Sequence, residues 1–473
     1  MTNNSKNKYL LKNTAIFAVG NFASKFISLF LVPLYTNCMV AAEYGTADLL
    51  YTICNFLIPL FTLNITEAVL RFSLDKNCDR RKIIRIATTM LLPIATIGLV
   101  SIPILNLIDG FSKFAIWFYF YMLTTATSQV FLVTLKGQEK LKKYTMGNIL
   151  HTFLIAGFNV IFLLVLNMGV TGYFLAYILA NVIIAIYGAF NCDVADCIRN
   201  SSFDKKLFMQ MTKYSAILIP TTFMWWIMNF LDRVMISGMM DVSKSGIYAV
   251  SYKVPTILSS VSSIFMQAWL FSAIRNDMEE DNEKYTNSIF RMMCFILVAT
   301  SIPLLVLVKW IFSFYVAPEY YIAWGYVPSL MIGHVFLTLS TFISTQYNVN
   351  KDSKGHLKSA SVGAIMNLIL NAILIPLIGV QGAAIATTIS YISVFIFRMF
   401  DTRKYLKMHF TSRMFIMSLL VVTVSVALFM PATLGCAVET FSIIAFLIVG
   451  WPEIKVIYST IAKMLNRIKK GVK

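Results

Sequence analysis

The sequence NTAIFAVGNFASKFISLFLVPLYT, residues 13–36, follows a basic segment and is apolar apart from a few polar side chains. About 20 apolar residues in a helix are long enough to cross a hydrocarbon core of about 30 Å. One charged residue, Lys25, lies near the middle of this stretch. The rest of the chain contains further apolar stretches, and basic segments separate them in pairs.

Apolar stretches of this length occur fourteen times in the 473 residues. They lie at 13–36, 46–70, 83–107, 114–135, 145–167, 170–191, 213–238, 246–272, 286–310, 322–347, 359–378, 380–400, 413–431 and 434–457. Hydrophobic residues make up 58% of the chain and charged residues 13%, whereas soluble domains contain about 25% charged residues. The composition therefore predicts an all-α polytopic membrane protein with about fourteen transmembrane helices.

The basic residues predict the orientation of these helices. Of the 40 lysines and arginines, 34 lie in eight polar segments that face one side in this arrangement. These segments are Lys6–Lys12, Arg71–Arg85, Lys136–Lys143, Arg199–Lys213, Arg275–Arg291, Lys351–Lys358, Arg398–Arg413 and Lys455–Lys473. The positive-inside rule assigns this side to the cytoplasm, together with both termini. The net charge of +18 is then explained by loops that face an anionic leaflet, and nucleic-acid binding is not expected.

The chain also contains two related halves. Seven residues recur without gaps at an offset of 201: Lys12, Ala15, Ile16, Phe22, Met39, Gly45 and Tyr51 match Lys213, Ala216, Ile217, Phe223, Met240, Gly246 and Tyr252. Six helices in each half give both halves the same orientation, and a transport pathway between two such lobes is the physical interpretation. We expect an N-lobe at 1–200, a C-lobe at 201–400, and a C-terminal helix pair with a basic tail at 401–473.

Three cations lie within predicted spans: Lys25, Arg233 and Lys253. A charge in lipid costs at least about 2.5–3.5 kcal/mol, so a charged residue inside a span usually faces a watery cavity or a partner. Snorkelling to the outer surface is an alternative for Arg233 and Lys253. Together the three would form a basic patch that suits a phosphate or pyrophosphate group, with the arginine binding it bidentately.

Acidic residues within the spans have two interpretations. Asp232 and Asp48 either pair with a lysine, such as Lys25, or bind a coupling proton or sodium ion. Glu67 lies four residues before Arg71, which predicts an i,i+4 ion pair at the cytoplasmic mouth.

The motifs that would indicate an enzyme are missing from the sequence. It contains no GxxxxGK[ST], HExxH or GxSxG pattern. Its seven cysteines are scattered, and its four histidines have no ligand-like spacing. We therefore expect a transporter without a cofactor, driven by its substrate, the membrane potential, or H⁺ or Na⁺ coupling.

Several segments resemble a known family. EAVLRF at 67–72, NFLDRVMISGMMDVSKSGIYAVSYK at 229–253 and GAIMNLILNAILIPLIGVQGAAIATTIS at 363–390 are similar to Wzx-type oligosaccharide flippases. That family belongs to the multidrug/oligosaccharidyl-lipid/polysaccharide exporter superfamily. The resemblance covers essentially the whole chain, and the Asp-Arg pair at 232–233 followed by Gly-Ile-Tyr at 246–248 is among its more specific parts.

The resemblance implies a flippase of the bacterial cytoplasmic membrane with two six-helix lobes around a cavity that opens alternately to each side. It implies that the substrate is an undecaprenyl-pyrophosphate-linked oligosaccharide, moved outward for capsule, O-antigen or exopolysaccharide synthesis, with polymerase machinery as a further partner. The cations implied to bind its head group are Lys25, Arg233 and Lys253. The alternatives are a lipid II flippase, a drug/cation antiporter of the same superfamily, and a membrane glycan polymerase, which the short outward loops disfavour.

Overall fold

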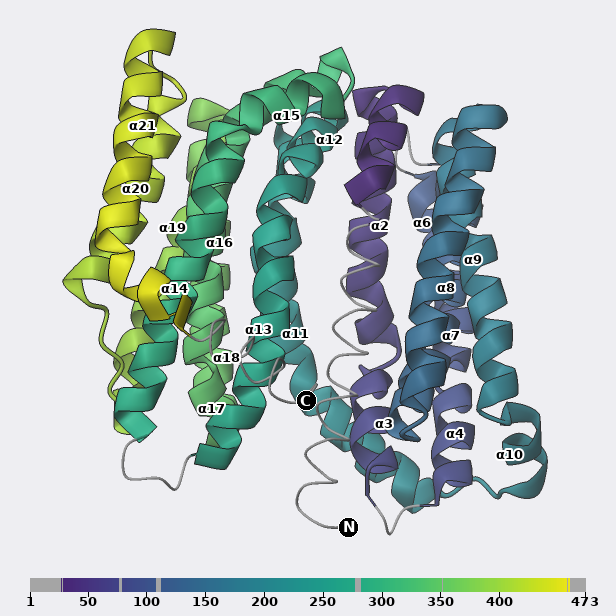
Figure 1. The fold of residues 1–473 in the computed structure, drawn as a ribbon. Helices are drawn as coiled ribbons and strands as arrows, with labels where there is room; N and C mark the ends of the chain where they lie inside the picture. The colour runs from purple at the N-terminus through teal and green to yellow at the C-terminus, as the bar shows by residue number, and fades with distance from the viewer. Residues whose placement is uncertain are drawn as a thin grey trace, which may run out of the picture. The chain divides into compact units, whose positions relative to one another are not determined.

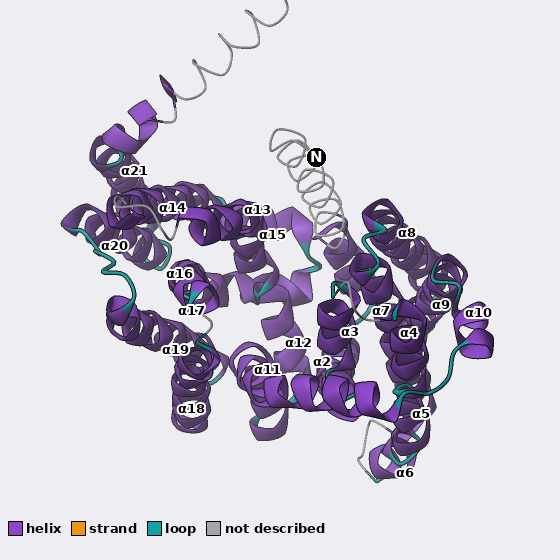
Figure 2. Cartoon of the chain, turned by 90° about the horizontal axis from the view of Figure 1, so that it is seen from below, coloured by secondary structure: helices purple, strands orange, loops and turns teal. Residues whose placement is uncertain are grey.

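The computed structural model describes residues 27, 29–75, 79–107, 112–276, 282–350, 352–456 and 458–459. All secondary structure in these ranges is helical (Figure 2). Ten of their helices are long and apolar enough to cross a membrane, or eleven if one bent pair is counted as a single span. Shorter apolar helices at Leu29–Cys38 and Ser412–Ala427 coincide with two further predicted segments. The all-helical membrane class is confirmed, while the count of fourteen and the cytoplasmic termini stay predictions.

The described residues form two compact units, of which the first contains those up to Val250 together with Tyr315–Tyr321. Its helices are α2 (Ala41–Phe61), α3 (Ile65–Ser73), α4 (Arg80–Thr89), α5 (Leu92–Gly98), α6 (Ser101–Asn106), α7 (Ala115–Gly137), α8 (Leu141–Asn159), α9 (Gly169–Asn191), α10 (Val194–Asn200), α11 (Lys205–Met239) and α12 (Val242–Ser251) (Figure 1). A π-helical turn, Val160–Val165, continues α8. The third predicted span, 83–107, is divided among α4, α5 and α6.

Tyrosine rings fill part of the core of this unit. Helices α7 and α9 pack along each other. The rings of Tyr121 and Tyr177 lie 5.7 Å apart, and those of Tyr173 and Tyr177 lie 4.8 Å apart. Aromatic pairs at these distances add about 0.5–1.5 kcal/mol each to the burial of their area. This packing anchors the helices against which α2 lies.

The second predicted span is broken into two helices that differ in direction by 56°. Pro59 cannot donate a backbone hydrogen bond near the end of α2. Leu63 and Asn64 follow with φ angles of 51° and 54°, in the left-handed region that ends a helix. The chain then resumes as α3. The break places the end of α2 beside the middle of α11.

Two glycines allow α2 and α12 to touch backbone to backbone. A Cβ on Gly45 would lie 2.0 Å from the carbonyl oxygen of Val242, and one on Gly246 would lie 2.3 Å from that of Ala41. Only glycine fits at so close an approach. Gly45 and Gly246 are also equivalent residues in the repeat at offset 201, so equivalent positions of the two halves meet at this contact.

The second unit contains the described residues at 251–314 and from Ile322 onward. Its helices are α13 (Lys253–Asn276), α14 (Asn282–Val306), α15 (Val308–Tyr315), α16 (Val327–Ile343), α17 (Thr345–Val349), α18 (Ser353–Ile378), α19 (Val380–Asp401), α20 (Ser412–Ala427) and α21 (Ala432–Val449). The short 3-10 helix Pro318–Tyr326 crosses the boundary between the units. This boundary follows packing, whereas the predicted ranges 1–200, 201–400 and 401–473 follow the repeat and stay predictions.

A buried arginine connects three helices of the second unit. The side chain of Arg398 on α19 is fully buried. Its Nε donates to the Ser359 hydroxyl on α18 at 3.0 Å, and its Nη1 donates to the Ser340 carbonyl on α16 at 2.9 Å. The sequence placed this residue among the surface charges of a loop. It lies instead inside the helix packing.

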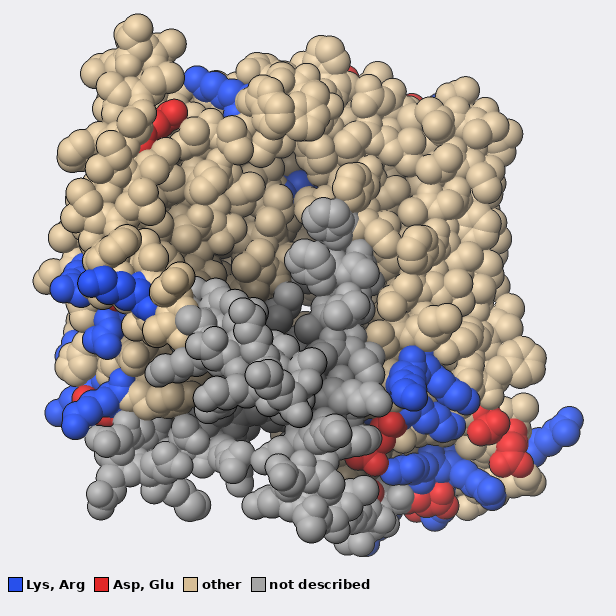
Figure 3. Space-filling view, in the orientation of Figure 1, with Lys and Arg blue, Asp and Glu red and all other residues tan. Residues whose placement is uncertain are grey.

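Charged residues gather at one end of each unit. In the first unit they surround α4 and α10, where Lys82 pairs with Asp204 at 3.1 Å and Arg81 with Asp196 at 3.8 Å, whereas the surface above them carries almost no charge (Figure 3). We call the membrane side that carries the eight basic segments the basic side. Charged residues at one membrane surface, next to an uncharged surface that faces the lipid, are typical of a membrane protein.

Candidate functional site

The centre of the candidate site is an ion pair between α2 and α11. The Arg233 Nη1 lies 3.0 Å from the Asp48 Oδ2, and both side chains are 8% exposed. Arg233 precedes the end of α11 by six residues and Asp48 follows the start of α2 by seven. At 1.5 Å per residue, both lie about 10 Å from the helix ends opposite the basic side. The pair is therefore buried at a depth where an isolated charge would be costly.

The same guanidinium has further contacts within the unit. The Thr52 hydroxyl, one helical turn beyond Asp48, lies 3.5 Å from the Arg233 Nη1. The Phe230 ring lies under the guanidinium, with its centroid 5.4 Å from Cζ, a cation–π arrangement. The Ser245 hydroxyl on α12 donates to the Arg233 carbonyl at 3.0 Å. Side chains from three helices thus fix the position of Arg233.

Asp232 points to another neighbour. It accepts a hydrogen bond of 2.8 Å from the Tyr248 hydroxyl on α12, and its side chain is fully buried. Asp232 and Arg233 are adjacent on α11, so their side chains diverge by about 100° and each contacts a different helix. The sequence expectation of a lysine partner for Asp232 stays a prediction.

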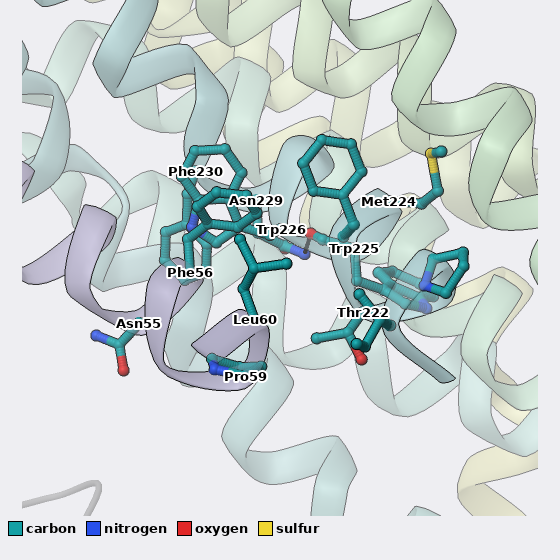
Figure 4. Close-up of a pocket in the computed structure, with 13 residues that line it drawn as sticks. Asn55, Phe56, Pro59, Leu60, Thr222, Met224, Trp225, Trp226, Asn229 and Phe230 are labelled. Carbon is teal, nitrogen blue, oxygen red and sulfur yellow. Dashed lines mark hydrogen bonds between the residues drawn. The ribbon is translucent and has the colours of Figure 1, made fainter. Parts of the chain in front are cut away.

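An aromatic cavity of about 610 Å³ lies beside the ion pair, between α2 and α11. Phe56, Trp226 and Phe230 lie together in its wall (Figure 4). The Phe56 and Trp226 ring centroids are 4.4 Å apart. The Trp226 Nε1 donates to the Thr52 carbonyl at 3.1 Å. Thr52 therefore contacts both Arg233, through its hydroxyl, and the cavity wall, through its carbonyl. A charged group and an apolar cavity are thereby joined in one site.

Two prolines line the cavity, Pro59 on α2 and Pro220 on α11. Each leaves a backbone carbonyl one turn earlier without its helical donor and weakens the helix there. Beyond Pro59, the Asn64 amide donates to the Thr222 hydroxyl at 3.4 Å and connects the break between α2 and α3 to α11. The points at which α2 and α11 are weakened therefore both lie in the wall of the cavity.

The other predicted site residues are distributed as follows. Lys25 lies outside the described residues. Lys253 is the first residue of α13 in the second unit and is half-buried. Glu67 and Arg71 are exposed on α3. The structure brings together Asp48 and Arg233, whereas the convergence of the three cations stays a prediction.

Sequence reasoning missed several parts of the site. Asp48 and Arg233 were recognised separately, but their pairing was not predicted. Thr52, Phe56 and Trp226 carry no charge and were not singled out. The dipeptide Trp225-Trp226 within a span was a signal, because tryptophan is usually found at the membrane interface and not within the span.

No group of three or more His, Cys, Asp or Glu residues suited to a metal ion occurs in the described ranges. The described site itself consists of a cation, an acid, a hydroxyl group and aromatic rings. Such groups bind and orient a ligand.

Two archaeal proteins are similar to this chain. It is 24% identical over 312 residues to a probable low-salt glycan biosynthesis flippase, Agl15, of Haloferax volcanii, and the match covers 64% of each chain. It is 25% identical over 417 residues to the uncharacterized membrane protein MJ1375 of Methanocaldococcus jannaschii, covering 83% of this chain and 97% of that protein.

Solved structures share the fold. An inward closed conformation of the lipid II flippase MurJ has a TM-score of 0.71 at 13% identity, covering 95% of this chain and 100% of that structure. An inward-facing multidrug resistance transporter of the MATE family has a TM-score of 0.64 at 13% identity, covering 81% and 93%. Identities this low establish the arrangement of helices alone.

The family is established by a model described as polysaccharide biosynthesis protein, which matches residues 10–274. This range includes α2, α11, α12 and the whole candidate site. The resemblance seen in the sequence is thereby confirmed: the chain belongs to the polysaccharide biosynthesis protein family.

Proposed function

We propose that this protein is a flippase for an undecaprenyl-pyrophosphate-linked oligosaccharide, which it moves from the inner to the outer leaflet of the bacterial cytoplasmic membrane by alternating access. The product would serve capsule, O-antigen or exopolysaccharide synthesis, in which a polymerase would use it. Family membership and the flippase relative support the class. The observation that carries the proposal is the junction of the buried Arg233 with the aromatic cavity, which suits a ligand with an anionic head and an apolar tail.

In this mechanism the head group exchanges with Asp48. A guanidinium alone at this depth would cost at least about 2.5–3.5 kcal/mol, so Arg233 requires an anionic partner throughout the cycle. Asp48 is that partner in the structure, at 3.0 Å. A pyrophosphate oxygen would replace the carboxylate as the substrate enters and would release Arg233 to Asp48 as it leaves. Protonation of Asp48 would weaken its hold on Arg233 and couple the exchange to a proton gradient.

The membrane potential favours the outward direction. Two negative charges moved out of a negative interior gain about 4–5 kcal/mol per 100 mV if the site remains fixed. A site that travelled with its ligand would cancel this gain. Alternating access to a fixed site retains it and requires no nucleotide.

The test is flipping in proteoliposomes that contain the purified full-length chain. Three cargoes are compared: an undecaprenyl-pyrophosphate-linked oligosaccharide, lipid II and the cationic dye ethidium. The sugars are followed by an impermeant lectin and the dye by its fluorescence. We expect transport of the oligosaccharide above protein-free vesicles. Transport of lipid II alone or ethidium alone would overturn the proposal.

A variant tests the cation assigned from the sequence. Lys25→Ala should lower the flipping rate at least about tenfold, because a buried charged contact to the head group is worth about 1.5–3 kcal/mol. Lys142→Ala, which changes an exposed lysine on the basic side, is the matched control. Unchanged flipping by Lys25→Ala would remove that residue from the site while leaving the class of transporter intact.

A further inference from the structure

A second cavity, lined by charged and hydroxyl side chains, lies in the second unit, away from the residues discussed so far. Its volume is about 530 Å³, and its walls come from the beginning of α14, the beginning of α20 and residues 452–456 after α21. Ligand sites commonly have volumes of about 300–1,000 Å³. All three segments belong to the basic side, where a phospholipid head group of that leaflet would lie.

Three charged side chains line this cavity: Arg291, Arg413 and Glu453. Arg291 is half-buried and Arg413 is exposed. Glu453 is only 8% exposed, and its Oε2 has no hydrogen-bond partner. No ion pair within 4 Å joins any of the three in the described ranges.

This arrangement is unusual for a purely structural cluster. A buried carboxylate is normally paired or hydrogen-bonded, because a buried polar atom without a partner destabilises the folded state. Two guanidiniums line the same cavity, yet neither neutralises the acid. Opposite charges held apart around one space suit a ligand that itself carries both signs.

The surrounding groups match the head of a lipid. Arg291 comes directly before the apolar run that begins at Met292, which places it where α14 enters the hydrocarbon. The hydroxyls of Ser288 and Ser412 also line the cavity. Lysines and arginines are concentrated around this part of the unit at the lower left of Figure 3. A phosphate would be held by the arginines and the serine hydroxyls.

We propose that this cavity binds the phosphoethanolamine head group of a phospholipid in the leaflet on the basic side. The phosphate lies between Arg291 and Arg413, and the primary ammonium donates hydrogen bonds to Glu453. Phosphatidylglycerol has the phosphate and hydroxyl donors but no positive charge, so it cannot neutralise the Glu453 carboxylate. Phosphatidylcholine has a positive charge but no N–H donor, so it cannot satisfy Glu453 either. The bound lipid bridges α14 and the C-terminal helix pair.

Native mass spectrometry of the purified full-length chain tests this site. Phosphatidylethanolamine, phosphatidylcholine and phosphatidylglycerol with identical acyl chains are added in turn, and the bound fraction is measured. We expect one phosphatidylethanolamine to bind at least about fivefold more tightly than either of the other two. Equal binding of the three lipids, or preference for phosphatidylglycerol, would overturn the proposal.

Variants separate the two halves of the head group. Glu453→Gln should abolish the preference for phosphatidylethanolamine over phosphatidylcholine while both still bind, because the arginines remain. Arg291→Gln and Arg413→Gln should each weaken binding of all three lipids about fivefold or more. Lys354→Gln, at an exposed lysine on the same side, should change nothing.

Folding of each variant is checked by size-exclusion chromatography. For any variant that fails this check, competition of glycerophosphoethanolamine against labelled lipid on the unmodified protein replaces it. Displacement by this soluble head group, and not by glycerophosphocholine, supports the site. Retention of the full preference in Glu453→Gln, or equal displacement by both head groups, contradicts it. None of these outcomes depends on flipping.

Discussion

Arg233 and Asp48 neutralise each other inside the first unit, and this pairing dominates the behaviour of single residues in the site. Removing one partner leaves an uncompensated buried charge, which typically costs about 3–5 kcal/mol. Removing both leaves two neutral polar groups and costs much less. The two residues should therefore be strongly coupled.

We predict that the single substitutions Asp48→Asn and Arg233→Gln each lower the thermal stability of the purified protein more than the double variant Asp48→Asn/Arg233→Gln does. Unfolding temperatures in one detergent measure this difference. Glu67→Gln, at an exposed acid of the same broken span, should leave stability nearly unchanged. If the losses from the two single substitutions simply added in the double variant, the ion pair would contribute nothing to stability.

At this scale the sequence predicted which charges lie in membrane spans but not the partners they meet. Asp48 and Arg233 were recognisable because charged residues are rare in such segments. Their contact depends on how α2 packs against α11, and no local pattern contains that information. The burial of Arg398 was missed for a similar reason: its position near the end of a span resembles that of a loop residue.

Between elements, the contact of α2 with α12 is the tightest approach described above. Alanine normally stabilises a helix by about 1 kcal/mol relative to glycine. At Gly45 and Gly246 the new methyl group would meet backbone oxygens at 2.0 and 2.3 Å, and backbone cannot move as a flexible side chain does. The helices would have to separate.

We predict that Gly45→Ala and Gly246→Ala each lower the unfolding temperature and the flipping rate. Gly238→Ala on α11 is the control, because a Cβ there has nothing within 4 Å, and it should leave the protein unchanged or slightly more stable. Thermal unfolding and the vesicle assay measure both effects. Normal stability of Gly45→Ala would mean that the two helices do not touch.

The beginning of α18 has a cap with a defined pH dependence. Asp352, outside the membrane-spanning segments, accepts from the Gly355 N–H at 2.9 Å, from the Tyr405 hydroxyl at 2.9 Å and from Lys404 Nζ at 3.1 Å. The Gly355 N–H, followed by these side chains, lowers the pKa of Asp352 from 3.8 to about 2. A depressed pKa stabilises the folded state above pH about 4, and this contribution is lost as the pH falls toward 2.

We predict that Asp352→Ala destabilises the protein by about 1 kcal/mol at neutral pH, the usual value of a helix N-cap. Asp352→Asn keeps an acceptor for the Gly355 N–H and should lose less. Unfolding temperatures at pH 7 and between pH 4 and 2 measure the effect, which should shrink in the acid range. A difference between variant and parent that stays constant across this range would contradict the pKa argument.

The hydropathy of the sequence predicted where the helices lie, but it did not predict where they are interrupted. The segment 46–70 contains a 56° bend, and 83–107 is divided into three helices. Pro59 signalled the first of these. The exact position at Leu63 and Asn64 could not be predicted, because neither is a glycine and both adopt positive φ under tertiary constraint.

For the molecule as a whole, the arrangement of charges predicts the orientation in the membrane. Lys142 belongs to a segment assigned to the cytoplasm. Lys244 is exposed near the start of α12, between two predicted spans and on the side opposite the basic segments. The repeat and the positive-inside rule both depend on this arrangement. The family and the fold are established without any assumption about this orientation.

We predict that Lys244→Cys is labelled by an impermeant maleimide on intact cells, whereas Lys142→Cys is labelled only after the cells are broken. The experiment uses a variant in which all seven native cysteines are replaced by serine. The opposite pattern would reverse the topology and place the substrate entrance on the wrong leaflet.

Helix α11 is 35 residues long, about 52 Å at 1.5 Å per residue, whereas the hydrocarbon core is about 30 Å thick. The residues before the span predicted to begin at 213 therefore extend beyond the hydrocarbon core. They form the end of a lever arm that pivots at Pro220, about 22 Å from the tip at Lys205. Tilting this arm by about 10° would sweep the tip through about 4 Å. Small motions at the cavity wall would thus be magnified at the basic side of the protein.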